Sequence, residues 1–118
     1  MKLSFITIMV RDIEKTIAFY EQIIGMEVKR RFNPAQGKIV FMGHAGDSIM
    51  LEFIEFAEYE KVKTSGLVMS YTSDRPLEEK RQQLLESGYF PSEIIDNSPK
   101  PKHFNVKDPD DICVEFTE

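Results

Sequence analysis

The first third of the chain begins with a strand pattern and continues with a helix pattern. Residues 3–10 are almost continuously apolar and rich in β-formers, which is typical of a strand covered on both faces. Apolar residues then recur at helical spacing over 13–24. Asp12 is placed to cap this helix, and Gly25 suits the left-handed position that ends it. We therefore expect an interior strand followed by a helix.

Three more strand patterns complete the first half of the chain. Residues 26–32, 38–42 and 48–54 have strand character and are separated by turn residues. Within the last of them, alternation places Glu52 on the same face as its apolar neighbours two positions away. One carboxylate is thus expected on an otherwise apolar face.

A charged connection over 57–65, with room for one helical turn, precedes a second series of patterns. Strands are predicted over 67–72, 89–93, 102–107 and 112–117. Between the first two of these, Asp74 is predicted to cap a helix with Pro76 in its first turn and Gly88 at its end. Each half therefore has the order strand, helix, three strands.

The two halves also match in spacing. From the predicted cap to the helix-ending glycine to a strand glutamate, the intervals are 13 and 27 residues in the first half and 14 and 27 in the second. The glutamates are Glu52 and Glu115. This internal repeat indicates two modules, 1–56 and 66–118. One module alone exposes a sheet face, so two modules, in one chain or across a dimer, are expected to close around a shared cavity.

Composition and charge exclude several classes of function. The chain has 42% hydrophobic residues and a net charge of −5, without a basic run that could bind nucleic acid. The apolar stretch 3–10 is too short to span a bilayer, so no membrane association is expected. Cys113 is the single cysteine and has no disulfide partner, which favours a reducing cytoplasm.

Several short segments resemble the glyoxalase/bleomycin-resistance/dioxygenase proteins of the vicinal oxygen chelate superfamily. Residues 5–12, 18–20 and 24–26 resemble the first module of this family. Residues 108–115 resemble its final hairpin, although Asp111 stands where the family usually has glycine. The resemblance implies one α+β domain over 1–118, with two tandem βαβββ modules whose curved mixed sheet surrounds a shared pocket. It also implies a homodimer.

The resemblance further implies positions for a metal site. In metal-dependent members, four side chains hold a divalent ion, and these positions carry over to Phe5, Glu52, Leu67 and Glu115. Phe and Leu have no donor atom, and two carboxylates alone hold transition metals poorly. We therefore expect no cofactor; the alternative is Zn²⁺, Ni²⁺, Mn²⁺ or Fe²⁺, with His103 replacing a missing ligand.

Two interpretations of the glutamates remain open. If Glu52 and Glu115 approach each other across an apolar cavity, they should share a proton, and at least one pKa should rise. Such a pair would suit general acid/base catalysis or recognition of a cation. Alternatively, they form ion pairs with residues such as Arg30 or Lys38, or lie on the solvent side of their strands.

The remaining pocket candidates follow from strand alternation. The residues expected to line the pocket are Phe5, Phe41, Met50, Leu67 and His103. His103 could instead face solvent, because its direction depends on strand register. Phe53 and Phe116 should face away from the glutamates and pack under the helices.

Three classes of function agree with these observations. The first is a protein that binds, and in doing so sequesters, a partly aromatic or cationic small molecule. The second is a glyoxalase-like, metal-dependent lyase or isomerase in which Glu52 or Glu115 moves a proton. The third is a non-catalytic dimeric or sensory module. No glycine-rich phosphate loop or catalytic triad pattern is present.

Overall fold

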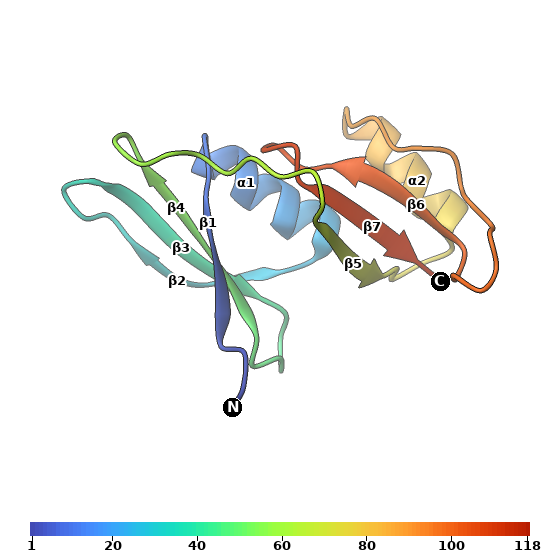
Figure 1. Ribbon diagram of the computed structural model, residues 1–118, viewed down its shortest axis with the longest axis horizontal. Coiled ribbons are helices and arrows are strands. Elements are labelled where there is room, and N and C mark those ends of the chain that lie inside the picture. The colour runs from blue at the N-terminus through green and yellow to red at the C-terminus, as the bar shows by residue number, and fades with distance from the viewer. The chain divides into compact units, whose positions relative to one another are not determined.

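A computed structural model describes residues 1–118, which divide into two compact units. The first unit is Met1–Val62 and the second is Lys63–Glu118. The division lies inside the connection predicted over 57–65. Each unit has its own small mixed sheet and its own helix (Figure 1).

The first unit contains the predicted strand, helix and three further strands. Its elements are β1 (Phe5–Met9), α1 (Ile13–Phe19), the π-helical turn η1 (Tyr20–Ile24), β2 (Glu27–Phe32), β3 (Gly37–Gly43) and β4 (Met50–Phe56). The strand order in the sheet is β1-β4-β3-β2. β1 runs parallel to β4, and the other pairs are antiparallel.

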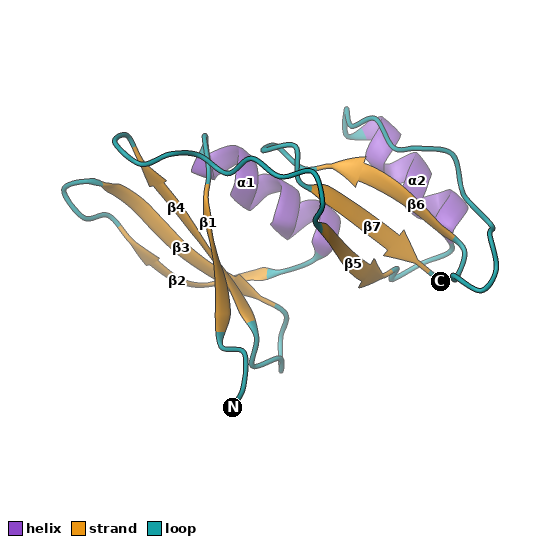
Figure 2. Cartoon of the chain, viewed as in Figure 1, coloured by secondary structure: helices purple, strands orange, loops and turns teal.

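The second unit repeats this arrangement with one strand fewer. Its elements are β5 (Val68–Thr72), α2 (Leu77–Glu86), β6 (His103–Lys107) and β7 (Cys113–Thr117). The strand order is β5-β7-β6, with β5 parallel to β7 and β6 antiparallel to it (Figure 2). In both units the first strand therefore pairs in parallel with the last.

The predicted helix over 13–24 is confirmed, and so are its two end signals. The Asp12 carboxylate accepts hydrogen bonds from the backbone N–H groups of Glu14 and Lys15, at 3.1 and 3.2 Å. The chain leaves the helix at Gly25 with φ 85°, a left-handed conformation that glycine adopts without steric cost. The last five helical residues form a π-helical turn rather than a continuation of α1.

The prediction that Asp74 caps the second helix is wrong. α2 begins at Leu77, directly after Pro76, and Pro76 occupies the cap position without a side-chain hydrogen bond. Asp74 lies two residues too early to reach the first N–H groups of the helix. Its carboxylate instead lies 3.3 Å from the ammonium of Lys80, a residue that is only 3% exposed.

Three further expectations about the strands and the connection need correction. β1 lies at the edge of its sheet, and Phe5 and Ile6 are 43% and 42% exposed, so in this unit the strand is not interior. No strand forms over 89–93, where Pro91 has no N–H to donate; Ser92 and Ile95 hydrogen-bond to β6 without forming a strand. The connection over 57–65 contains a turn but no helical turn.

Each sheet has a helix face, which packs against the helix of its own unit, and an opposite open face. On the helix face of the first unit, the rings of Tyr20 and Phe53 lie 4.9 Å apart. On that of the second, the rings of Phe104 and Phe116 lie 5.2 Å apart. Phe53 and Phe116 are buried there, which confirms that they face away from the glutamates. None of the helices combines the length and the apolar composition that a membrane-spanning segment needs.

Removing the Phe53 ring should destabilise the first unit strongly. Phe53→Ala leaves a cavity at a side chain that is 0% exposed, so we expect a loss of about 3–5 kcal/mol in the free energy of unfolding, measured with urea. Phe90→Ala is the matched control, because Phe90 is 91% exposed. It should change the free energy of unfolding by less than about 0.5 kcal/mol. Equal effects from the two substitutions would contradict the assignment of Phe53 to the core.

Candidate functional site

The glutamate that recurs in the last strand of each unit has a hydroxyl partner in the first strand of the same unit. Thr7 pairs with Glu52 in the register of β1 and β4, and its Oγ1 donates to Glu52 Oε1 at 2.5 Å. Ser70 pairs with Glu115 in the register of β5 and β7, and its Oγ donates to Glu115 Oε1 at 2.6 Å. Both partners precede their glutamates by 45 residues. Sequence reasoning missed these hydroxyls, although the equal separation was visible in the chain.

The same register corrects the position assigned to Leu67. Phe5 lies two residues before Thr7, and the residue two before Ser70 is Val68. Val68 therefore stands where Phe5 stands, and Leu67 precedes the first residue of β5. Val68 is also apolar and supplies no metal donor.

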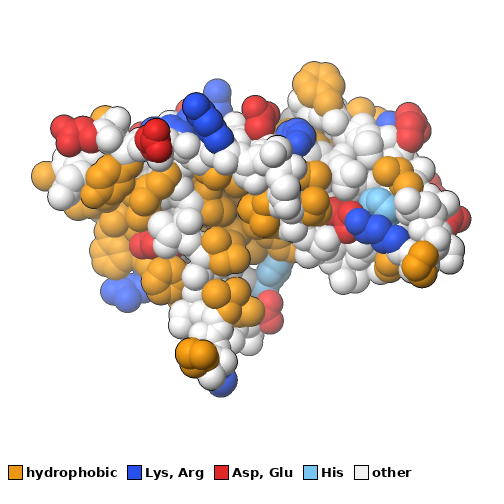
Figure 3. Space-filling model, viewed as in Figure 1, with side chains coloured by type: hydrophobic (Ala, Val, Ile, Leu, Met, Phe, Trp, Pro, Cys, Tyr) orange, Lys and Arg blue, Asp and Glu red, His pale blue; other side chains and the backbone are white.

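The open face of the first unit brings three predicted pocket residues together beside Glu52. The rings of Phe5 and Phe41 meet edge to face, with centroids 5.3 Å apart. Met50 is the partner of Phe5 in β4, and Phe41 in β3 is the partner of Glu52. Hydrophobic side chains gather over this part of the molecule in the space-filling view (Figure 3). Glu52 is thus a half-buried carboxylate on an aromatic and aliphatic surface.

No cation of its unit neutralises Glu52. The hydrogen bond from the Thr7 hydroxyl is its one polar contact, and the proposed ion pairs with Arg30 or Lys38 do not form. Lys38 lies on the helix face, where its ammonium is 4.0 Å from a carboxylate oxygen of Glu14. Within the first unit, the charge of Glu52 is therefore free to interact with a bound cation.

Glu115 has a different environment on the open face of the second unit. Its side chain is 4% exposed, and the Lys100 ammonium lies 2.6 Å from its Oε2. Nε2 of His103 lies 3.8 Å from the same oxygen. Across the sheet, Asn105 in β6 is paired with Glu115, so the carboxylate lies in a row of polar side chains. One glutamate of the repeat thus has an internal counter-ion and the other has none.

The pKa of Glu115 is lowered, which agrees with the ion-pair interpretation of this glutamate and not with a shared proton. Burial by itself would raise the pKa of this carboxyl. The hydrogen bonds from Lys100 and Ser70, together with the charges of Lys100 and His103, outweigh burial and lower it below its ordinary value of 4.5. At neutral pH, Glu115 is therefore ionised and is no proton donor.

The structure also settles which way His103 faces. Its side chain lies on the open face of the second sheet with Glu115 and is 5% exposed. The ring Nδ1 lies 2.8 Å from the backbone carbonyl oxygen of Pro101, to which it donates as the N–H tautomer. Leu67, by contrast, is 46% exposed and outside the strand. These two residues belong to the second unit, whereas Phe5, Phe41 and Met50 belong to the first.

The residues around the two glutamates do not fit a transition metal. No group of three or more His, Cys, Asp or Glu side chains is arranged to hold an ion. Oε2 of Glu115 already contacts an ammonium, and the neighbours of Glu52 are one hydroxyl and apolar groups. A site for Zn²⁺ or Ni²⁺ needs three or four nitrogen, sulfur or carboxylate donors.

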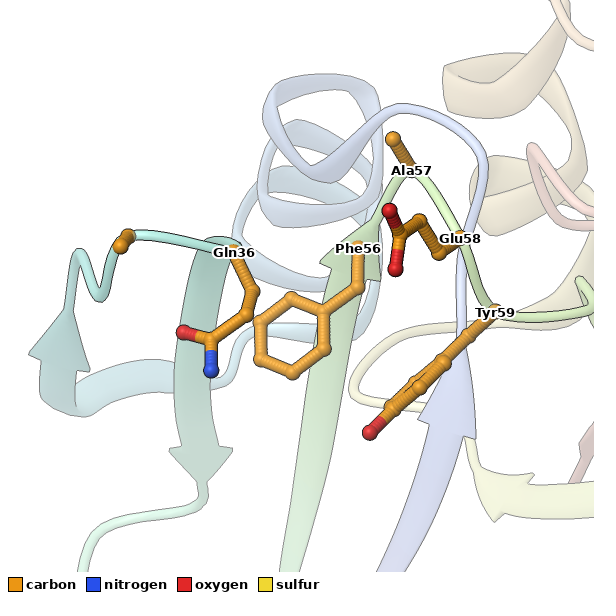
Figure 4. Close-up of a pocket in the computed structure, with 6 residues that line it drawn as sticks. Gln36, Phe56, Ala57, Glu58 and Tyr59 are labelled. Carbon is orange, nitrogen blue, oxygen red and sulfur yellow. The ribbon is translucent and has the colours of Figure 1, made fainter.

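A separate open hollow of about 590 Å³ lies beside the end of β4. It is lined by Ala35, Gln36, Phe56, Ala57, Glu58 and Tyr59. The rings of Phe56 and Tyr59 border it with centroids 5.3 Å apart (Figure 4). None of the predicted site residues lines this hollow.

Comparison with known proteins agrees with the resemblance read from the sequence. The model of the Glyoxalase/Bleomycin resistance protein/Dioxygenase superfamily matches residues 2–116. The uncharacterized protein YwbC of Bacillus subtilis (strain 168) is 29% identical over 117 residues, which cover 92% of this chain and 90% of that protein.

Solved structures share the fold at low sequence identity. TnmS3, an antibiotic binding protein from Streptomyces sp. CB03234, has a TM-score of 0.76 at 17% identity. The superposition covers 99% of this chain and 94% of the TnmS3 chain. A glyoxalase family protein from Enterococcus faecalis also has a TM-score of 0.76, at 20% identity, with 99% and 97% covered. The predicted glyoxalase-like α+β fold is thereby confirmed.

Removing the ammonium that contacts Glu115 should raise the pKa of that carboxyl. In Lys100→Met, burial remains while the largest stabilising contact of the ionised form is lost, so the pKa should rise from its lowered value. A titration of the Glu115 side-chain carbon by NMR measures it. Lys63→Met, which removes an exposed lysine of the same unit, should leave the titration unchanged. An unchanged pKa in Lys100→Met would show that this ion pair does not form in solution.

Glu115 should also contribute to the pH dependence of stability. Because its pKa in the folded protein lies below the ordinary value of 4.5, its contribution is fully present above about pH 4.5 and is lost as pH falls through the folded pKa. Thermal unfolding of the wild type between neutral pH and pH 3 should therefore show a loss of stability. Glu115→Gln should lack that part of the loss. Parallel curves for the two proteins would contradict the pKa direction.

Proposed function

The chain belongs to the glyoxalase/bleomycin resistance protein/dioxygenase superfamily, and we propose that it is a member that binds, and so sequesters, a small, partly aromatic cation. The proposed contact surface is the open face of the first unit. One observation carries the proposal: Glu52 is a carboxylate without a cationic partner in its unit, set among Phe5, Phe41 and Met50.

Such a surface favours a ligand that combines an apolar ring with a positive charge. A planar ring gains aromatic contacts of about 0.5–1.5 kcal/mol each with Phe5 and Phe41 beyond the area that it buries. A cationic group gains a charge-assisted contact with Glu52, which the apolar surroundings strengthen. A neutral ligand of the same shape would leave the carboxylate partly desolvated and unpaired.

The two glutamates support different roles. Glu115 is buried and already contacts Lys100, so a cationic ligand would have to displace an internal ammonium there. Glu52 requires no displacement, because its polar partner is a neutral hydroxyl. We therefore assign ligand recognition to Glu52, and we assign to Glu115 and Lys100 a role in stabilising the second unit.

The shared fold supports a binding role without fixing the ligand. TnmS3 is described as an antibiotic binding protein, so this fold serves in at least one protein whose purpose is to hold a small molecule. The donor set around each glutamate supports recognition without a metal cofactor. The homodimer and the closure of both modules around one pocket remain predictions.

A glyoxalase-like lyase or isomerase is the second candidate function. Glu52 favours it, because a half-buried carboxylate with one hydroxyl contact can accept a proton from a bound substrate. Glu115 is less suited to that role, since Lys100 and Ser70 stabilise its ionised form and weaken it as a base. In this candidate, as in the first, the carboxylate of the first unit performs the function.

N-methylacridinium and neutral acridine test the charge preference of the surface. By isothermal titration calorimetry, the wild type should bind the cation more tightly than the neutral ring of the same shape. Glu52→Gln retains the oxygen that accepts from Thr7 but loses the charge, so its Kd for the cation should rise roughly tenfold, about 1.4 kcal/mol. Glu21→Gln, an exposed change of the same kind on η1, should leave the Kd unaltered.

The outcomes separate the candidates. Equal affinities for both probes, or a cation affinity that Glu52→Gln leaves intact, would overturn recognition of a cation by Glu52. Turnover of α-oxoaldehyde thiohemiacetals that Glu52→Gln abolishes and Glu115→Gln preserves would favour the lyase or isomerase. If sedimentation shows a homodimer and calorimetry shows that this dimer does not bind N-methylacridinium, ligand binding at the open face would be contradicted.

A further inference from the structure

The open face of the first unit carries a second charge, at Arg30. The next residue, Arg31, forms an ion pair with Glu14 of α1, which places it on the helix face. Arg30 therefore projects from the opposite side of β2. Its guanidinium lies over the ring of Phe32, with Cζ 4.9 Å from the ring centroid. No carboxylate pairs with it, so the open face holds one uncompensated cation as well as one uncompensated anion.

Strand register places these two charges in one row. Arg30 in β2 pairs with Phe41 in β3, and Phe41 pairs with Glu52 in β4. The Thr7 hydroxyl completes the row in β1. Neighbouring strands lie about 4.8 Å apart, so the backbones of Arg30 and Glu52 are separated by about 10 Å, with an aromatic ring between them.

The other charged side chains of β2 and β3 already form ion pairs. Glu27 and Lys29 in β2 form an ion pair at 3.1 Å. Arg31 and Lys38 both lie beside Glu14 on the helix face. Arg30 and Glu52, by contrast, both lie on the open face, with Phe41 between them. Neither has an opposite charge directly beside it.

We propose that the ligand is a zwitterion with an aromatic body, whose cationic group contacts Glu52 and whose anionic group contacts Arg30 while its ring packs on Phe41. The inference rests on the proposed function and adds the anionic group to it. Charge complementarity argues for this occupant: a purely cationic ligand satisfies Glu52 but approaches Arg30 with like charge. The planar guanidinium suits a carboxylate, sulfonate or phosphate, which it can contact through two N–H groups.

The test compares two probes that have the same ring. N-sulfopropylacridinium carries the acridinium cation and a tethered sulfonate, whereas N-methylacridinium carries the cation alone. The wild type should bind the zwitterion about twofold to fivefold more tightly than the cation, the range for an exposed ion pair. That ratio should fall to about one in Arg30→Gln. It should also shrink as salt rises, because Arg30 is exposed.

Arg31→Gln is the matched control, because it removes the neighbouring charge from the other face of the same strand. It should preserve the ratio of the two affinities. If N-methylacridinium binds through Glu52 but the zwitterion gains nothing, or Arg31→Gln lowers the ratio as much as Arg30→Gln does, the zwitterion proposal is overturned and cation binding stands. If neither probe binds the wild type, both proposals fail.

Discussion

The parallel pairing of the first strand with the last strand determines where the candidate groups of each unit lie. In the first unit this pairing sets Thr7 beside Glu52, and in the second it sets Ser70 beside Glu115. A slip of one residue would turn every side chain of a strand to the other face. The hydroxyl–carboxylate hydrogen bond therefore exists only in this register, and it is the same in both halves of the repeat.

The two units share this register but differ in the charges around their glutamates. The second glutamate is buried and contacts the ammonium of Lys100, which keeps its pKa low and makes it part of a local polar network. The first has only its hydroxyl partner and lies among aromatic side chains. This difference agrees with the proposed recognition of a ligand by Glu52 alone, since a buried Glu115 without a counter-ion would cost stability.

The division of the first sheet into a helix face and an open face explains which charged side chains can reach Glu52. Arg31 and Lys38 lie beside Glu14 on the helix face, so they cannot neutralise Glu52. Arg30, one residue away from Arg31, projects from the open face and stays available. Because side chains alternate along β2, the two neighbouring arginines point to opposite faces. Arg31 forms an ion pair with Glu14, and Arg30 takes the proposed role in recognising an anion.

The sequence by itself determined the family, the order of the elements apart from a strand expected over 89–93, the first helix with its Asp12 cap and Gly25 end, and the burial of Phe53 and Phe116. These features depend on local chemistry and on strand alternation, which a single chain displays. It could not determine that Asp74 is no cap, that Val68 rather than Leu67 corresponds to Phe5, or that Lys100 contacts Glu115. Those facts depend on strand register and on a loop that returns to the sheet, and only the tertiary structure, which brings distant residues together, decides them.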